Sequence, residues 1–342
     1  MDRLGRCQLS PLADRQERES EVNLRPRHLE EYVGQGKIID NLRVFVRAAQ
    51  QRRESLDHIL LSGPPGLGKT TLAQLIAAEL GVELKVTSGP AIARPIDLLV
   101  LLNGLRPQQV LFIDEIHRLS RVVEEILYPV MEDRSFDRII SKGNAKGSIQ
   151  HRLPPFTLVG ATTRAGALSS PLRSRFGILF QLELYTPEEL AQIVRRSAGI
   201  LEIDIDREGS LEIARRCRGT PRLANRLLKR VRDFVQVEGA STITAAAADR
   251  ALERMGIDSH GLDQTDRRIL DLLVNRYQGQ PVGLSTLAAA LQEEPENLED
   301  VYEPYLLAAG FIVKTPRGRQ PGPLLLPPES GNSNAELGMR NS

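Results

Sequence analysis

One glycine-rich segment ends in residues that could bind the phosphates of a nucleotide. Residues 63–70 read GPPGLGKT, which fits the pattern G-x-x-x-x-G-K-[ST]. The glycines let backbone N–H groups surround phosphate oxygens where a helix begins. Lys69 would reach the β- and γ-phosphates, the Thr70 hydroxyl would bind Mg²⁺, and Thr71 would add a polar contact. A connecting turn without a ligand is the alternative, but the strand before the segment and the helix after it favour a phosphate site.

Two carboxylates at the end of an apolar run could serve a metal ion and a water molecule. Residues 110–115 read VLFIDE. The four apolar residues predict a buried strand that delivers Asp114 and Glu115 to the carboxyl end of a sheet, where α/β proteins bind ligands. Asp114 would hold Mg²⁺, mostly through water, and Glu115 would orient and activate the attacking water. A solvated acidic loop is the alternative, and the glycine-rich segment upstream favours the ATPase interpretation.

Three more polar residues could complete a site for ATP hydrolysis. Thr163 ends another apolar run and could sense the γ-phosphate, or it could cap the strand. Arg175 follows a turn and could act as an arginine finger on a neighbouring subunit's nucleotide, or it could be a solvated cation. Arg222 stands in the first turn of a predicted helix, where a cation is unfavourable and therefore hints at a bound anion. Each of these signals is weak alone.

A parallel α/β sheet is needed to bring these residues together. Continuous apolar runs alternate with helical segments such as 69–80, and this alternation predicts an α/β domain over 21–185. The predicted strands are 58–62, 83–88, 110–114, 156–161 and 178–184.

Helices replace strands after Tyr185. A capping box with proline at the first helical position begins a small helical lid domain over 186–256. Residues 256–261 are expected to be a hinge. Three helices and a two-stranded wing then give a winged-helix order over 257–320. The predicted fold is a P-loop α/β domain, a helical lid and a C-terminal winged helix.

The two ends of the chain are predicted to lie outside these domains. Residues 1–20 mix charges of both signs, lack an apolar region and are expected to form a flexible arm, not a secretory signal. Proline, glycine, serine and asparagine dominate from Gln320 onward, which predicts a disordered tail over 321–342.

Composition excludes several classes of protein. The 342 residues carry 45 Lys and Arg against 44 Asp and Glu, so any nucleic-acid contact must come from local basic patches. Aromatic residues make up 4% and tryptophan is absent, which argues against a base-stacking platform. The two cysteines, Cys7 and Cys217, form neither a disulfide framework nor a metal cluster and suit a cytoplasmic protein. No run of apolar residues is long enough to predict a membrane span.

Together these motifs resemble the AAA+ ATPases and, within them, the RuvB family of bacterial Holliday-junction branch-migration motors. The resemblance covers roughly residues 20–320, and its most specific parts are the stretch from Asp114 to Asp133 and the wing. The matching segments are 29–35, 63–73, 114–119, 123–129, 160–166 and 315–319.

The resemblance implies roles for individual residues. Thr163 matches sensor 1, Arg175 the finger that acts in trans and Arg222 sensor 2, so these three join Lys69, Asp114 and Glu115 as catalytic residues. The positions implied to contact ATP are Leu24, Arg25, Gly66, Gly68, Lys69, Thr70, Thr71, Glu132, Asp133, Arg134, Arg175, Tyr185 and Arg222.

The resemblance also implies two surfaces for partners. A hairpin is predicted between Phe136 and Phe156, with Ile139, Ile140 and Ile149 expected to dock the partner RuvA; a hairpin without function is the alternative. Lys314, Arg317 and Arg319 match wing positions that touch DNA phosphates without reading sequence.

The DNA contact is expected to be weak in each subunit. Pro295 stands where the family often has an arginine near DNA, which puts that contact in doubt. Residues 257–342 also carry more acidic than basic side chains. Avidity in a ring of subunits would compensate for weak binding by each one.

The implied activity is ATP-driven, Mg²⁺-dependent pumping of duplex DNA through a hexameric ring. The expected partners are Holliday-junction and duplex DNA, RuvA by direct docking and RuvC in the resolving complex, in recombination, DNA repair and the SOS response. Two rival interpretations stay open. One is an initiator-like AAA+ machine that binds a specific duplex sequence, and the other is a nucleotide-switched DNA-binding module without sustained turnover.

Overall fold

The computed structural model describes residues 24–142 and 145–325. The chain divides into two compact units, Met1–Ala251 and Leu252–Ser342. The predicted arm over 1–20 and most of the predicted tail lie outside the described residues.

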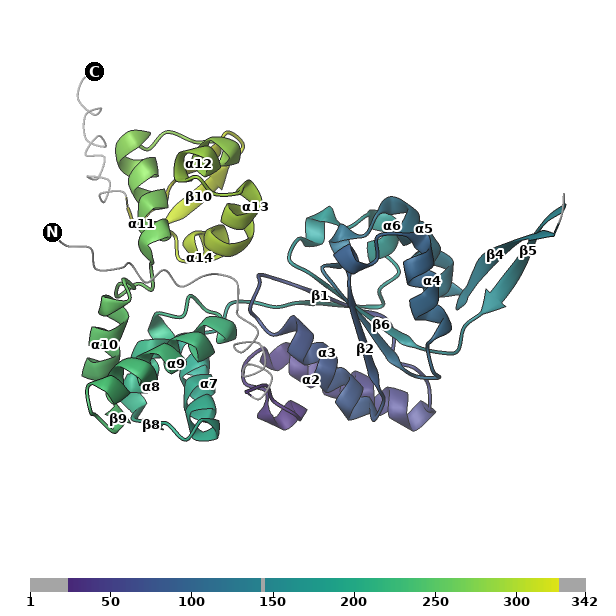
Figure 1. Ribbon diagram of the computed structural model, residues 1–342, viewed down its shortest axis with the longest axis horizontal. Helices are drawn as coiled ribbons and strands as arrows, with labels where there is room; N and C mark the ends of the chain where they lie inside the picture. Colours follow the sequence, from purple (N-terminus) through teal and green to yellow (C-terminus); the bar gives the residue numbers. More distant parts are fainter. Residues whose placement is uncertain (1–23, 143–144, 326–342) are drawn as a thin grey trace, which may run out of the picture. The chain divides into compact units, whose positions relative to one another are not determined.

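The first unit is built on a five-stranded parallel sheet in the order β2-β3-β6-β1-β7 (Figure 1). This confirms the predicted α/β class. Strand β6 is buried at every residue, because strands lie on both sides of it and helices cover the sheet. The strands are β1 (Ile59–Ser62), β2 (Leu84–Ser88), β3 (Val110–Asp114), β6 (Thr157–Thr162) and β7 (Ile178–Gln181).

Helices cover both faces of this sheet (Figure 1). Apolar side chains of α4 and α5, such as Leu98 and Leu127, pack with Ile113 and Leu158 of the sheet in one core. Helices α2 and α3 lie on the opposite face (Figure 1). The bounds are α2 (Gly36–Arg52), α3 (Lys69–Leu80), α4 (Pro95–Asn103), α5 (Arg121–Glu132) and α6 (Ser170–Arg173).

An antiparallel hairpin follows α5 and projects from the α/β part of the unit (Figure 1). Its strands are β4 (Ser135–Lys142) and β5 (Ala145–Arg152). The backbones of Ile139 and Ile140 pair with Ser148 and Gly147, as a hairpin requires. The side chains of Ile139, Ile140 and Ile149 lie outside the described part of the structure.

The helical lid follows the α/β part of the first unit, and the boundary between the two units falls within its last helix. Its first helix begins with the predicted capping box, in which Thr186 and Glu189 bond each other's backbone N–H groups. Strands β8 (Asp204–Ile205) and β9 (Thr242–Ile243) form a two-residue parallel pairing. This pairing joins the loop after α7 to the loop before α10. The helices are α7 (Pro187–Ile200), α8 (Arg207–Arg215), α9 (Pro221–Val237) and α10 (Ala245–Arg254).

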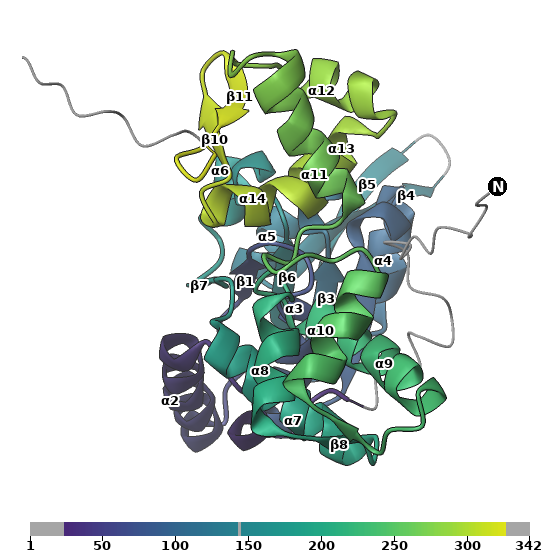
Figure 2. The ribbon, with the colours of Figure 1, turned by 90° about the vertical axis from the view of Figure 1, so that its left-hand side faces the viewer.

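The second unit has the predicted winged-helix order. Its elements are α11 (Gln264–Asp271), α12 (Leu284–Leu291), α13 (Pro295–Asn297), α14 (Glu303–Ala308), β10 (Ile312–Thr315) and β11 (Gly318–Pro321). Helix α11 ends in a π-helical turn at Leu272–Arg276, and a second π-helical turn, Leu298–Tyr302, joins α13 to α14. Strands β10 and β11 lie side by side as the wing (Figure 2).

The predicted start of the tail is wrong by a few residues. Gln320 and Pro321 belong to strand β11 and pair with Val313 and Ile312. The Gly322 N–H then donates to the Phe311 carbonyl at 2.7 Å. Backbone hydrogen bonds across the wing therefore order a segment whose proline- and glycine-rich composition alone predicts disorder.

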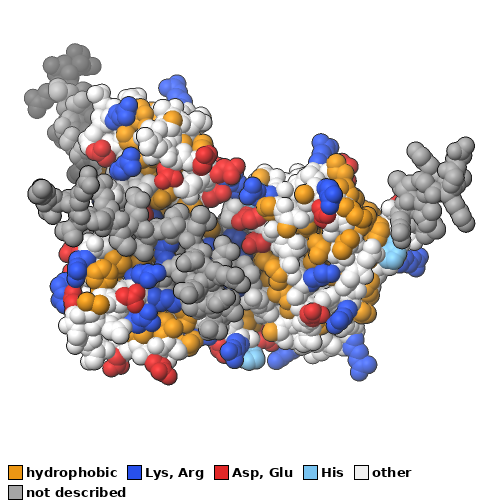
Figure 3. Space-filling model, in the orientation of Figure 1, with side chains coloured by type: hydrophobic (Ala, Val, Ile, Leu, Met, Phe, Trp, Pro, Cys, Tyr) orange, Lys and Arg blue, Asp and Glu red, His pale blue; other side chains and the backbone are white. Residues whose placement is uncertain are grey.

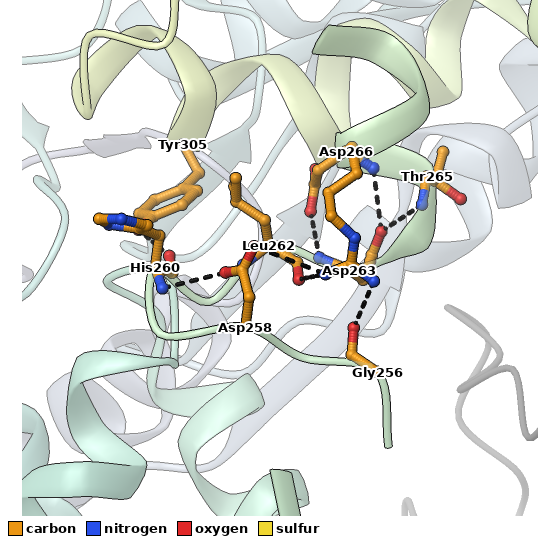
Figure 4. Close-up of polar contacts among 9 residues, drawn as sticks. Gly256, Asp258, His260, Leu262, Asp263, Thr265, Asp266 and Tyr305 are labelled. Carbon is orange, nitrogen blue, oxygen red and sulfur yellow. Dashed lines mark hydrogen bonds and ion pairs between the residues drawn. The ribbon is translucent and has the colours of Figure 1, made fainter. Parts of the chain in front are cut away.

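The segment expected to be a hinge is tied to the winged-helix unit (Figure 4). The Asp258 carboxylate accepts hydrogen bonds from the N–H groups of His260 and Leu262, at 3.0 and 2.9 Å. The Tyr305 hydroxyl donates to the His260 carbonyl at 2.6 Å. The Asp263 carboxylate caps α11. These contacts fix Asp258 and His260 to neighbouring residues of the winged-helix unit, and the hinge itself stays a prediction.

Candidate functional site

The glycine-rich loop between β1 and α3 has the backbone conformation that phosphate binding needs. Gly63 has φ +139°, and a Cβ there would lie 2.6 Å from the Leu182 carbonyl oxygen. Gly66 has φ +84°, and a Cβ there would meet Arg222 of the lid at 3.3 Å. Only glycine adopts these angles without strain, so the loop can curl over the start of α3 and direct its N–H groups inward.

Lys69 is held against this loop. Its side chain is buried, and its ammonium group donates to the carbonyls of Gly63 and Pro64 at 2.7 and 3.0 Å. A buried ammonium needs such partners, because desolvation disfavours an unpaired charge. The ammonium therefore lies within the loop itself, where phosphate oxygens could replace the two carbonyls.

The carboxylates of β3 lie at the same edge of the sheet as the loop. Asp114 ends β3 and accepts a hydrogen bond from the Glu115 N–H at 3.0 Å. Both residues line one cavity with Lys69, Thr70 and Thr71. Parallel strands present their carboxyl ends to one edge, which is why two motifs far apart in sequence meet here.

Thr70 and Asp114 fit the donor set of a Mg²⁺ ion. A hydroxyl and a carboxylate line the same cavity, and Mg²⁺ prefers oxygen ligands, retaining waters and substrate phosphates as the remaining ones. No cluster of three or more His, Cys, Asp or Glu side chains within the described residues could hold a metal ion independently.

Glu115 is oriented by neighbours on two other elements. Its backbone is in the left-handed region with φ 47°. The Thr163 hydroxyl donates to its carboxylate at 3.3 Å. His117 Nδ1 lies 3.2 Å from the same oxygen and 2.9 Å from the Thr162 hydroxyl. The structure thus brings the predicted sensor residue to the predicted water-activating residue.

The lid closes the other side of the cavity. The Arg222 N–H lies 3.4 Å from the Gly66 carbonyl, so the start of α9 touches the phosphate-binding loop. The Tyr185 hydroxyl donates to the Leu67 carbonyl at 3.3 Å and lies 2.8 Å from the Tyr32 hydroxyl. Burial raises the pKa of Tyr185 to about 12 and that of Tyr32 well above its ordinary value. The shifts keep both hydroxyls protonated even at alkaline pH.

The cavity contains most of the residues predicted to contact ATP. Those that line it are Leu24, Arg25, Gly66, Gly68, Lys69, Thr70, Thr71, Tyr185 and Arg222. Glu132, Asp133, Arg134 and Arg175 are not among its lining residues. The last group lies at the end of α5 and just after α6, where Arg175 pairs with Glu132 at 3.2 Å. The predicted site therefore divides into two places on the unit.

Comparison with known proteins agrees with this geometry. The family model described as Holliday junction DNA helicase RuvB P-loop domain matches residues 24–182. Models of the RuvB AAA lid domain and the RuvB C-terminal winged helix domain match residues 185–258 and 259–323.

Solved structures are similar over nearly the whole chain. The Thermotoga maritima RuvB Holliday junction branch migration motor is 48% identical, with a TM-score of 0.81, over 88% of this chain and 96% of that one. Two mutants of the Thermotoga protein are also 48% identical over the same shares, each with a TM-score of 0.82.

This chain belongs to the RuvB family. It is a P-loop ATPase of the AAA+ class that binds nucleotide, and the RuvB branch-migration motor acts on Holliday-junction DNA. No helix within residues 24–142 and 145–325 combines the length and the hydropathy needed to cross a lipid bilayer.

In the wing of this RuvB chain, the three cations predicted to contact DNA differ in their exposure and in their partners. Lys314 and Arg317 are exposed, and Lys314 lies 3.2 Å from the Glu299 carboxylate. Arg319 is buried, and its guanidinium donates to both Glu303 oxygens at 2.5 and 3.0 Å. A bidentate pair inside the unit fixes β11 against α14 and directs two of the five guanidinium N–H donors of Arg319 to Glu303.

Several residues at or beside the RuvB cavity were not predicted from the sequence, among them Arg196, which lines the cavity, and His117, which does not. Arg196 on α7 lines the cavity and donates to the Leu24 carbonyl at 2.7 Å and to Glu31 at 2.8 Å. His117 contacts Glu115, as described above. Neither had a signal of its own, because Arg196 is one of two adjacent arginines in an ordinary amphipathic helix and His117 is a lone histidine.

Proposed function

We propose that this protein hydrolyses ATP at the cavity between the α/β part and the lid and uses the energy to move duplex DNA in Holliday-junction branch migration. The observation that carries the proposal is the convergence of Lys69, Thr70, Asp114, Glu115 and Arg222 on one cavity. The RuvB domain order, with a winged helix after the lid, supplies the connection to DNA.

The residues of the cavity have distinct tasks in this reaction. Water attacks the γ-phosphate in line, and Glu115, held by Thr163, orients that water and accepts its proton. Lys69 exchanges its two carbonyl partners for phosphate oxygens, and Arg222 adds positive charge from the lid. Thr70 and Asp114 would hold Mg²⁺, which neutralises phosphate charge when it is bound.

Arg175 acts on a different subunit in this proposal. It does not line the cavity of its own chain, and it lies on the surface part of the unit near Glu132. An arginine finger that completes a neighbour's site requires a head-to-tail assembly of subunits, for which we propose the hexameric ring of RuvB-like motors. Glu132, Asp133 and Arg134 lie in the same place and would contact the neighbour's nucleotide from there.

Partners and location follow from the same proposal. RuvA would dock on the hairpin of β4 and β5, and RuvC would join when the junction is resolved, all in the cytoplasm. Exposed apolar side chains on α4 and α5 support a docking surface beside the hairpin: Ile96 is 53% exposed, Val100 65% and Val122 58%. Orange side chains gather over these helices in Figure 3.

Lys314 and Arg317 would follow the DNA backbone without reading its sequence.

A synthetic four-way junction tests the proposal. We expect dissociation of the junction to need ATP, Mg²⁺ and Lys69, with Lys69→Ala as the inactive control, and to be stimulated by RuvA. ATP turnover without movement of the junction would leave an AAA+ ATPase but remove branch migration. Sequence-specific binding to duplex DNA would then favour the initiator-like alternative, and a single round of hydrolysis would favour the nucleotide-switched module.

A further inference from the structure

Arg175 is held by an aromatic ring as well as by hydrogen bonds. Its guanidinium carbon lies 4.4 Å from the centre of the Tyr128 ring, within the range of a cation–π contact. One terminal nitrogen donates to the Pro171 carbonyl at 2.6 Å, and the other contacts the Glu132 carboxylate. The remaining nitrogen, Nε, is buried without a hydrogen-bond partner. The ring face is therefore a third contact of the guanidinium, beside the two hydrogen bonds of its terminal nitrogens.

Tyr128 is in turn fixed by two polar residues. Its hydroxyl donates to the Glu124 carboxylate at 3.3 Å and lies 3.3 Å from the Ser169 hydroxyl. Ser169 donates to the same Glu124 oxygen at 2.7 Å. Glu124 is 6% exposed. Its buried carboxylate therefore links Tyr128 on α5 to Ser169, the residue that precedes α6.

Ser169 also caps α6, the short helix that precedes the arginine finger Arg175. Ser169 caps α6 by accepting a hydrogen bond from the Leu172 N–H at 3.3 Å. Helix α6 has four residues, Ser170–Arg173, and such a short helix has little rigidity of its own. Arg175 leaves this short turn on a long side chain with many rotamers. A group that must meet a phosphate in another subunit works best when it is oriented in advance.

We propose that Tyr128 is a positioning residue for the arginine finger. Its ring, fixed by Glu124 and Ser169, holds the Arg175 guanidinium in the orientation that reaches the nucleotide of the neighbouring subunit. Tyr128 acts through Arg175 and does not line the cavity of its own chain. This inference rests on the proposed function, because it requires Arg175 to act in trans.

Steady-state kinetics of the full chain with duplex DNA test the role of the ring. We expect Tyr128→Leu to lower kcat for ATP about tenfold, the loss of one well-placed cation–π contact, while KM for ATP changes less than about twofold. Tyr128→Phe keeps the ring and should lower kcat about threefold or less. A kcat for Tyr128→Leu equal to that of the unaltered protein, or an equal loss in both variants, would overturn the proposal.

Mixtures of variants show which subunit carries the defect. Tyr128→Leu mixed with Lys69→Ala should recover turnover, because Lys69→Ala subunits bring an intact finger to the intact cavity of their neighbours. Tyr128→Leu mixed with Arg175→Ala should not exceed the turnover of Tyr128→Leu alone, because neither variant supplies a finger that the Tyr128 ring holds. Recovery in the second mixture and not in the first would place the defect in the cavity of the Tyr128→Leu subunit itself and overturn the proposal.

Two controls keep the results separable. Arg175→Ala mixed with Lys69→Ala must recover turnover if the finger acts in trans, so its failure refutes the proposed function rather than the role of Tyr128 alone. If Tyr128→Leu does not fold, as judged by circular dichroism, Ser169→Ala removes one support of the ring with a small change in volume. It should lower kcat about two- to fivefold with the same pattern in mixtures, and an unchanged kcat would count against the network.

Discussion

The nucleotide cavity of the first unit and the wing of the second both depend on positively charged side chains, but they hold them in different ways. In the cavity, Lys69 is buried and bonded to two carbonyls of its own loop. In the wing, Lys314 and Arg317 are exposed, and only Arg319 is buried in a bidentate pair with Glu303.

The difference follows from what each place must do. Charge that develops on a transferring phosphate is stabilised by groups that are already oriented in a site with little water. Attraction to the DNA backbone needs only exposed charge near phosphates, and most of its free energy comes from released counterions. We therefore expect substitutions in the first unit to abolish turnover and substitutions in the wing to weaken binding by degrees.

Arg175→Ala should have the largest effect. We expect ATP turnover to fall by roughly a thousandfold or more while nucleotide binding is kept, because an arginine finger stabilises charge mainly in the transition state. Arg173→Ala, which removes an exposed cation two residues earlier on α6, is the matched control and should turn over ATP normally. Unchanged turnover in Arg175→Ala would refute the trans-finger role.

Glu115→Gln should come next. Turnover is expected to fall about a hundredfold to ten-thousandfold, because the amide cannot accept the proton of the attacking water. Binding of a fluorescent ATP analogue should be nearly unchanged, since Glu115 orients water and not the phosphates. Glu125→Gln on the exposed face of α5 provides the control. Substantial turnover in Glu115→Gln would move the base to another residue.

Arg319→Ala should lower the free energy of unfolding, an effect that a role in DNA contact alone would not predict. Removing one partner of a buried pair leaves Glu303 charged and uncompensated, which costs about 3–5 kcal/mol in the free energy of unfolding. Urea unfolding followed by circular dichroism measures this loss. Arg317→Ala, at an exposed site of the same wing, should stay within about 0.5 kcal/mol. Equal stability of the two variants would show that the buried pair does not hold the wing.

Lys314→Ala and Arg317→Ala should have the smallest effects. Each should weaken binding to duplexes of any sequence by a similar factor and should reduce the slope of log affinity against log salt by about 0.9. Fluorescence anisotropy over a salt series measures both quantities. Arg268→Ala, an exposed cation on α11, is the control. A loss that depends on the base sequence would contradict contact with the backbone alone.

Much of the fold could be read from local patterns. The apolar runs at β1, β3 and β6 predicted a parallel sheet, and the Thr186–Glu189 capping box predicted the start of the lid. The patterns failed where tertiary contacts overrode local preference. Pro321 was predicted to begin a disordered tail, but it lies in strand β11 and pairs with Ile312. Residues 256–261 stay a predicted hinge, of which Asp258 and the His260 carbonyl bond residues of the winged-helix unit.

The candidate site shows the same division. The sequence by itself determined which groups can do the chemistry, because a glycine-rich loop and a strand that ends in two carboxylates carry their function in residue type and spacing. Only the tertiary structure decided how these groups are held. Arg196 reaches Leu24, Tyr128 lies over Arg175, and Arg319 is bound by Glu303 across sequence separations that no local pattern encodes. Side-chain contacts of this kind depend on how helices and strands pack, and packing is a property of the whole unit.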